Sequence, residues 1–240
     1  MAMFCVALVC VVVAAALEGE DRDESKPPRR SVWAVLGSTD GVTDGSATGN
    51  GSWITRVSAG LPVDIDPQIQ NLSRPGSTIA RARSEQLPVA IEMRPDVTTV
   101  WLVIDDLIAG TPLDSYARDL RGILDALTAA GSQVALGNVP AVQVRPEHEQ
   151  FAGDLPNHRA MAEDRNRSIA RIAERPGVEL IDLWSVTNDQ PFVVELVDGG
   201  WRLSEPALER LAGRFRPAVA RAISEAKRPG RYLDADREGL

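Results

Sequence analysis

The chain has 240 residues, of which 44% are hydrophobic and 25% are charged. This balance is typical of a globular protein of one domain, and it excludes a disordered or fibrous chain. The formal net charge of -8, together with a sequence that has no basic, aromatic-rich patch, argues against a nucleic-acid partner, because phosphates require a basic face. A small molecule that is neutral or cationic is the more natural partner.

The N-terminal segment predicts export. Residues 2–17 form an uncharged apolar run, and a charged segment, residues 18–30, follows at once. At about 1.5 Å per residue, such a helix is shorter than a hydrocarbon core of about 30 Å, which favours a signal-peptide core over a spanning helix. We expect a secreted protein or one held by an uncleaved N-terminal anchor, with no other contact with the membrane. Residues 18–30 then form a flexible linker, residues 31–227 a folded domain and residues 228–240 a C-terminal tail.

Hydrophobic patterning predicts an α/β domain. Short apolar runs rich in β-branched residues indicate strands at residues 32–36, 68–72, 97–104, 133–136 and 178–183. Helical spacing and capping residues indicate helices at about 53–61, 77–86, 111–131, 157–174 and 205–223. In detail, Ser77 and Thr111 are the expected N-caps of the second and third helices, and residues 141–156 are an expected polar loop. Strands that alternate with helices imply a five-stranded parallel sheet of order 2-1-3-4-5, covered on both faces.

The first strand ends in a loop typical of an active site. Gly37, Gly41 and Gly45 allow the backbone to approach a ligand closely. Ligands of open α/β sheets bind beyond the carboxyl ends of the strands, so Ser38 and Thr39 are among the first polar groups that a ligand would meet. Both cysteines, Cys5 and Cys10, lie in the N-terminal run, so the domain has no thiol nucleophile, disulfide or thiolate metal site.

Further segments follow in a characteristic order and spacing. They are Trp33–Gly37, Asn71–Thr78, Glu85–Pro88, Arg94–Asp106, Leu107–Leu113, Gly137–Pro140 and Asp198–Ser204. Together they resemble the SGNH (GDSL) hydrolase family over about residues 31–225. The resemblance implies a three-layer α/β/α, flavodoxin-like fold and the activity of an esterase or lipase. It also implies a nucleophile after the first strand, a Gly and an Asn as oxyanion donors, and a late Asp-x-x-His that supplies the base.

The residues at these implied catalytic positions differ from the family's pattern. The resemblance places Thr39 at the nucleophile position, with Ser38 one residue early, and Gly76 at the first oxyanion position. Asp105 stands where the Asn would be, and its carboxylate would repel the charge to be stabilised. Arg202 stands where the His would be, with Gly199 at the position of the Asp, and an arginine cannot accept a proton at working pH.

Several replacements for this chemistry remain open. His148 is a possible substitute base, and His158 is the other histidine of the chain. Asp105 and Arg202 could instead form a structural ion pair across the site. A cluster of acidic residues could hold a cation through oxygen ligands: Asp40, Asp44, Asp105 and Asp106. We expect a site without a metal or cofactor.

Two functions fit these observations. The first is an exported acyl-ester hydrolase or acyltransferase of SGNH type, with an eroded and possibly silent triad. The second is a non-catalytic SGNH-fold protein that binds an envelope glycan or glycolipid, an acyl chain or a protein partner. The fold does not distinguish them, because activity resides in the site.

Overall fold

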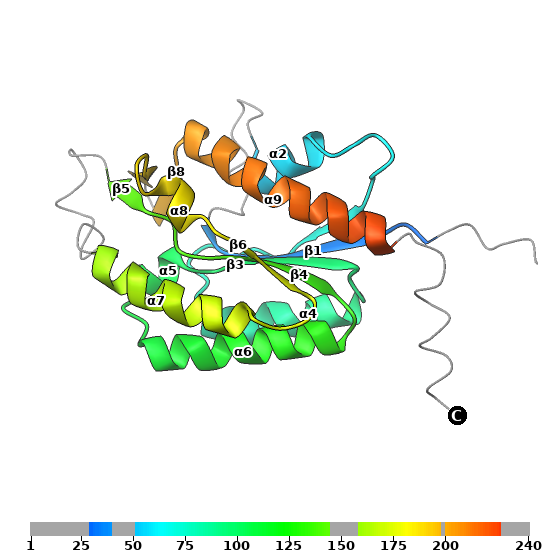
Figure 1. The fold of residues 1–240 in the computed structure, drawn as a ribbon, viewed down its shortest axis with the longest axis horizontal. Helices are drawn as coiled ribbons and strands as arrows, with labels where there is room; N and C mark the ends of the chain where they lie inside the picture. The colour runs from blue at the N-terminus through cyan, green and yellow to red at the C-terminus, as the bar shows by residue number, and fades with distance from the viewer. Residues whose placement is uncertain (1–28, 40–50, 145–157, 198–199, 227–240) are drawn as a thin grey trace, which may run out of the picture. The chain divides into compact units, whose positions relative to one another are not determined.

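A five-stranded parallel sheet forms the centre of the fold in the computed structural model, which describes residues 29–39, 51–144, 158–197 and 200–226. Its spatial order is β2-β1-β3-β4-β6, with every neighbouring pair parallel (Figure 1). In chain order these are five successive strands of the sheet, so the predicted parallel sheet of order 2-1-3-4-5 is confirmed. The strands are β1 (Val32–Gly37), β2 (Gln68–Asn71), β3 (Val97–Trp101), β4 (Gln133–Gly137) and β6 (Val178–Ile181).

Burial along the strands follows their place in the sheet. Every residue of the central strand β3 and of its neighbour β1 is buried. Such strands are apolar on both faces because helices cover both faces of a parallel sheet. The edge strand β2 has no fully buried residue.

Helices cover the two faces of this sheet (Figure 1). One face carries α2 (Trp53–Ala59) and α9 (Glu205–Ala226), where the rings of Trp53 and Phe215 pack with centroids 4.7 Å apart. The other face carries a helical stretch, residues 79–92, together with α6 (Leu113–Ala129) and α7 (His158–Ala173). The stretch 79–92 consists of α3 (Ile79–Arg81), a π-helical turn η2 (Ala82–Gln86) and α4 (Leu87–Glu92).

Several predicted boundaries are wrong: the helical stretch expected to end near residue 86 continues to Glu92, and β6 ends at Ile181 rather than at residue 183. Strand β3 ends at Trp101 rather than at residue 104, because its neighbour β1 ends opposite, at Gly37. A short helix, α5 (Ile104–Ile108), follows and places two carboxylates in its first turn, where the helix dipole favours them. Thr78 rather than Ser77 caps α3, and Pro112 rather than Thr111 precedes α6.

A second, three-stranded sheet was not predicted. It has the order β5-β7-β8, with β5 (Val142–Val144) parallel to β7 (Phe192–Val197) and β8 (Gly200–Leu203) antiparallel to it. The expected loop at residues 141–156 therefore begins with a strand. Three residues are too few for a periodic signal, which is why the sequence pattern missed β5.

The described residues from Ser31 onward belong to one structural unit, separate from residues 1–30. Among the residues that the structure describes, no helix is both long and apolar enough to cross a bilayer. The apolar run at residues 2–17, the linker up to residue 28 and the tail from residue 227 lie outside the described part.

Candidate active site

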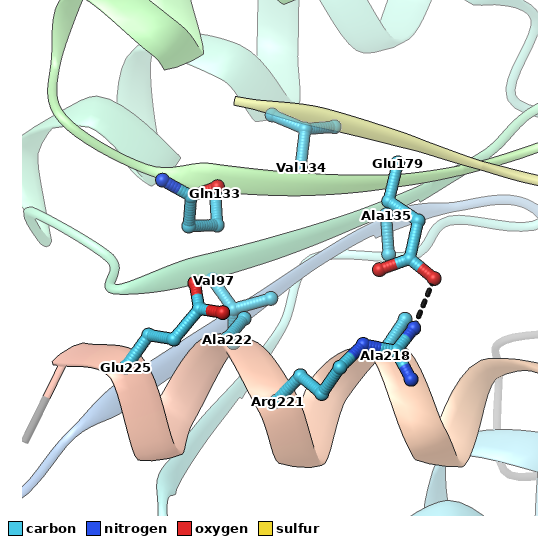
Figure 2. A pocket seen from close by; sticks show the side chains of 9 residues that line it. All are labelled: Val97, Gln133, Val134, Ala135, Glu179, Ala218, Arg221, Ala222 and Glu225. Carbon is cyan, nitrogen blue, oxygen red and sulfur yellow. Dashed lines mark hydrogen bonds and ion pairs between the residues drawn. The ribbon is translucent and has the colours of Figure 1, made fainter. Parts of the chain in front are cut away.

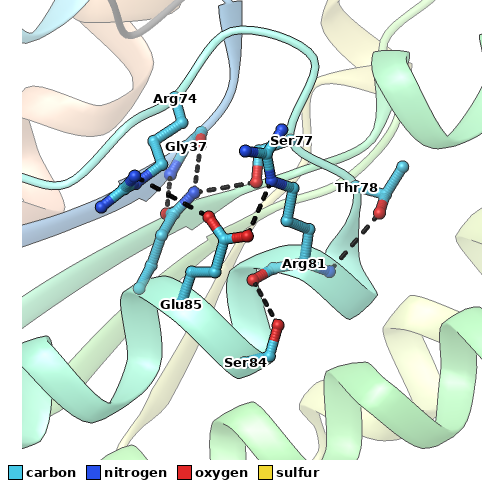
Figure 3. A network of polar contacts seen from close by, with 8 residues as sticks. Gly37, Arg74, Ser77, Thr78, Arg81, Ser84 and Glu85 are labelled. Atoms are coloured by element: carbon cyan, nitrogen blue, oxygen red, sulfur yellow. Dashed lines mark hydrogen bonds and ion pairs between the residues drawn. The ribbon is translucent and has the colours of Figure 1, made fainter.

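A buried glutamine fixes the root of the loop that follows β1. The side chain of Gln86, 1% exposed, accepts a hydrogen bond from the N–H of Gly37 at 3.0 Å and donates to the carbonyl of Gly37 at 2.9 Å. The same amide donates to the hydroxyl of Ser77 at 2.9 Å. Gln86 closes the π-helical turn, and π-helical turns are frequent at functional sites. Figure 3 shows how Gly37 and Ser77 meet in this network beside Glu85 and its arginine partners.

Gly37 allows a close approach of two chain segments at this root. A Cβ atom built at Gly37 would lie 2.4 Å from the hydroxyl oxygen of Ser73, much closer than real Cβ contacts allow. A side chain at this position would therefore displace at least the hydroxyl of Ser73, whose Cβ lies 3.3 Å from the same point. Glycine here brings the Ser73–Gly76 turn up to the loop that carries Ser38.

Ser38 and Thr39 both turn toward one carboxylate. The hydroxyl of Ser38, which is 2% exposed, donates to Oδ2 of Asp105. The hydroxyl of Thr39 lies 3.5 Å from the same oxygen and accepts a hydrogen bond from the N–H of Gly76 at 3.0 Å. Gly76 has φ +66, a conformation that glycine adopts without strain. The four predicted site residues from β1, β2 and β3 thus come together.

The fifth predicted residue, Arg202, does not join them. Arg202 is exposed and pairs with Glu195 on the neighbouring strand at 2.9 Å, so the expected ion pair between Asp105 and Arg202 is wrong. Trp201, one residue earlier and 2% exposed, donates its indole N–H to Oδ1 of Asp105 at 3.1 Å. Successive side chains of a strand point to opposite faces, so β8 presents Trp201 to the site and Arg202 to solvent.

The centre of the site is therefore a carboxylate that only accepts hydrogen bonds. Asp105 receives the hydroxyls of Ser38 and Thr39 on one oxygen and the indole of Trp201 on the other. An oxyanion hole needs donors aimed at the developing negative charge, and an ionised carboxylate offers none. In this arrangement the site is built around an acceptor, the carboxylate of Asp105.

The next residue, Asp106, points to a different set of partners. Its side chain is fully buried, and Oδ2 accepts a hydrogen bond from the N–H of Ile79 at 2.7 Å. Burial raises the pKa of Asp106 to about 6, although the nearby Thr111 hydroxyl, the Ile79 amide and Arg165 all oppose the rise. The two adjacent carboxylates of α5, Asp105 and Asp106, therefore have different surroundings.

Part of the predicted chemistry falls outside the described residues. His148, Asp40 and Asp44 lie there, and so does the side chain of His158. Within the described ranges, no group of three His, Cys, Asp or Glu side chains could hold a metal ion.

A small open pocket, with a volume of about 60 Å³, lies at the opposite end of the sheet (Figure 2). It is formed by the first residues of β3 and β4 together with α9, and the ion pair of Arg221 with Glu179 lies at its side. None of the predicted site residues lines it. The candidate site is therefore the cluster around Asp105 at the carboxyl ends of β1 and β3.

Comparison with known proteins identifies the family of the chain. The sequence profile of the GDSL-like Lipase/Acylhydrolase family matches residues 38–224. The chain belongs to this family. The resemblance to SGNH (GDSL) hydrolases inferred from the sequence is confirmed, and no curated protein sequence matches the chain.

Solved structures of GDSL hydrolases share the fold. The crystal structure of TesA is 20% identical with a TM-score of 0.60, and the match covers 80% of this chain and 99% of TesA. A putative GDSL-like lipase from Parabacteroides merdae is 14% identical with a TM-score of 0.60, covering 81% and 97%. The lipase/acylhydrolase from Enterococcus faecalis is 13% identical with a TM-score of 0.59, covering 79% and 95%. At these identities the likeness shows the fold, and the three-layer α/β/α class is confirmed.

Sequence reasoning missed Trp201 and Gln86. A signal for Trp201 was present, because reading the last segment one residue earlier aligns Asp198 and Trp201 with the GDSL family's Asp-x-x-His. That register keeps the aspartate and replaces only the histidine. Gln86 gave no comparable signal, since a single glutamine in a helical pattern is usually a surface residue.

Proposed function

We propose that this GDSL-family protein binds an acylated or glycan ligand of the cell envelope without hydrolysing it. The observation that carries the proposal is the bonding of Asp105, whose two carboxylate oxygens accept from Ser38, Thr39 and Trp201. The family supplies the expectation of an acyl ligand. The carboxylate of Asp105 cannot donate a hydrogen bond to the oxyanion that forms when an acyl ester is cleaved.

Two contributions to ester hydrolysis, a general base and an oxyanion donor, are absent from the described contacts of Asp105. A general base typically contributes about 10²- to 10⁴-fold to a rate, and one oxyanion donor about 10²- to 10³-fold. Asp105 occupies the donor position as an acceptor, and Trp201 occupies the base position with an indole that only donates. A carboxylate is also a weak base toward a hydroxyl, because their proton affinities differ by many pKa units.

A second candidate is an acyl-ester hydrolase or acyltransferase with a displaced triad. It is favoured by the amide of Gly76, which donates to the Thr39 hydroxyl at 3.0 Å and would lie beside an oxyanion formed there. Ser38 or Thr39 would be the nucleophile and His148 the substitute base. This arrangement requires a base to reach hydroxyls that Asp105 already holds.

Ester turnover separates the two candidates. We expect the purified protein to hydrolyse p-nitrophenyl acetate and butyrate no faster than Asp189→Asn and Thr39→Ala variants do, and all three rates to stay near the uncatalysed rate. Asp189 is an exposed residue of the connection between helix α8 (Trp184–Thr187) and β7, so it serves as the control. A rate typical of esterases that Thr39→Ala or Ser38→Ala abolishes and Asp189→Asn leaves intact would establish the displaced triad instead.

We also propose that residues 2–17 direct export, as a cleaved signal or as an anchor. The apolar run and the charged segment after it support this. The full chain and a chain that starts at Ser31 can be expressed in a bacterial host and fractionated. Export of the full chain alone is the expected result, and equal cytoplasmic retention of both would contradict the proposal.

A further inference from the structure

The hydrogen-bond partners of Asp105 are all neutral. They are the hydroxyls of Ser38 and Thr39 and the indole of Trp201. Among the side chains that the structure describes, none forms an ion pair with Asp105, which is half-buried. Carboxylates that are withdrawn from water are usually paired with a cation. The contacts within the described chain therefore leave the charge of this carboxylate without a counter-charge.

The arginines next to this site have other partners. Arg202, which follows Trp201 on β8, pairs with Glu195 at 2.9 Å and is exposed. Arg165 of α7 is 2% exposed and donates to the carbonyl of Thr111 at 2.7 Å. Neither arginine supplies the cation that a half-buried carboxylate favours.

The carboxylate of Asp105 can accept one more hydrogen bond. An ionised carboxylate has about four acceptor positions, two on each oxygen. Oδ2 receives the hydroxyls of Ser38 and Thr39, whereas Oδ1 receives only the indole of Trp201 from the described residues. Ser38 and Trp201 are each 2% exposed, but Asp105 is half-buried. A ligand therefore reaches the carboxylate more readily than it reaches the groups that hold it.

An open position on Oδ1 favours a ligand group that donates. The carbonyl oxygen of an ester only accepts hydrogen bonds, so it would face another acceptor here. A primary ammonium carries three donors and no acceptor, and its hydrogen bond to a carboxylate is charge-assisted. The formal net charge of -8 also favours the approach of a cation.

We propose that the open acceptor position of Asp105 binds the primary ammonium group of the ligand, so that the site selects a glycan or lipid that carries an amine. The inference rests on the proposed function, because it names the chemical class of the ligand bound there. Amine binding reads it out, whereas ester turnover reads out the proposed function. A protein that neither turns over esters nor binds amines would overturn this inference alone. An active esterase that binds amines would overturn the proposed function alone.

The first test compares amines with neutral analogues on the full chain. Glucosamine and N-acetylglucosamine represent a glycan, and hexylamine and hexanol represent a lipid. The indole N–H of Trp201 reports binding by NMR, because it donates to the same oxygen, Oδ1 of Asp105, at 3.1 Å. The reference is the buried indole of Trp33, which donates to Thr99 at 3.1 Å.

We expect at least one amine, in its protonated form, to shift the Trp201 resonance saturably and to leave that of Trp33 unchanged. It should bind about 10-fold or more tightly than its neutral analogue, because hydrogen bonds to charged groups are the stronger ones. The amine that binds more tightly identifies a glycan or a lipid as the source of the ammonium. Equal affinities within both pairs, or no saturable shift with either amine, would overturn the proposal.

The second test changes the carboxylate. Asp105→Asn keeps the shape of the side chain and removes its charge, so it should weaken amine binding by about 10-fold or more and erase the preference over the neutral analogue. The exposed-residue variant Asp189→Asn is the matched control and should keep both the affinity and the preference. A purely structural role of Asp105 predicts no preference for amines in the wild type. A preference that persists in Asp105→Asn would overturn the proposal.

A third comparison needs no variant, so it decides the question even if Asp105→Asn does not fold. The trimethylated form of the amine that binds keeps the positive charge but has no N–H to donate. We expect the wild type to bind it about 10-fold more weakly than the primary amine. Equal binding of the two would show that the site does not donate-match an ammonium through Oδ1, and would contradict the proposal.

Discussion

The root of the site loop, around Gly37, and the centre of the site, around Asp105, differ in the kind of hydrogen-bond partner that holds them. At the root, Gln86 satisfies both backbone groups of Gly37 and the hydroxyl of Ser77, all with neutral partners. At the centre, Asp105 collects donors around a negative charge. The root is thus held by neutral hydrogen bonds, whereas the centre is held by a carboxylate. Position and chemistry in one site are separable, and each can be perturbed alone.

The largest expected effect comes from changing the centre while the root stays as it is. Asp105→Asn combined with Trp201→His supplies an oxyanion donor and a base three residues after Asp198. We expect kcat/KM for p-nitrophenyl acetate to rise by about 10³-fold or more above the wild type, since each contribution alone is worth about 10²-fold or more. Adding Thr39→Ser should raise it further by supplying a less hindered nucleophile.

Asp105→Asn with Arg202→His is the matched control for this gain. Arg202 pairs with Glu195 away from the site, so a histidine there should add nothing to Asp105→Asn. If the Arg202 combination gave the larger rate, the placement of Trp201 at the base position would be wrong. The two double variants place the new histidine at adjacent positions of the sequence, which lie on opposite faces of β8.

The opposite perturbation breaks the root and leaves the centre unchanged. Gln86→Leu keeps the side-chain volume but removes the partner of the buried N–H of Gly37 and of the buried Ser77 hydroxyl, while the carbonyl of Gly37 keeps only the N–H of Arg74 at 3.4 Å. We expect a loss of about 2 to 5 kcal/mol in the free energy of unfolding, because each orphaned buried group costs about 1 to 3 kcal/mol. Urea unfolding measures this, with Gln190→Leu at an exposed position as the control. An equal, small loss in both would mean that Gln86 is not the support of the loop.

The same division explains how far the sequence predicts this protein. The order of the sheet follows from buried apolar runs such as Val32–Gly37, because a strand covered on both faces has little alternative. The first three site segments are predictable for the same reason, since Ser38, Gly76 and Asp105 follow strands that meet at one edge. The last segment is different, because it lies on β8, a strand that the pattern did not predict.

Because the sequence pattern did not predict strand β8, it gave no physical reason to place Trp201 rather than Arg202 in the site. In a strand, a shift of one residue moves a side chain to the other face, so an error of one position exchanges a site residue for a surface residue. The partners of Gln86 were also out of reach, because they lie 49 residues away at Gly37. Long-range hydrogen bonds of single polar residues leave no periodic trace in a sequence.

The smallest expected effect tests this assignment at Arg202 itself. Its ion pair with Glu195 involves an exposed guanidinium, and such surface pairs contribute about 0 to 1 kcal/mol. Arg202→Ala should therefore lower the free energy of unfolding by no more than about 0.5 kcal/mol, less at high salt. Trp201→Phe, which keeps a ring but removes the N–H donated to Asp105, should cost about 1 to 3 kcal/mol because it orphans a carboxylate oxygen. The two values compared in urea unfolding decide which face of β8 belongs to the site. A larger loss for Arg202→Ala than for Trp201→Phe would return Arg202 to the centre and make the separation of frame and chemistry untenable.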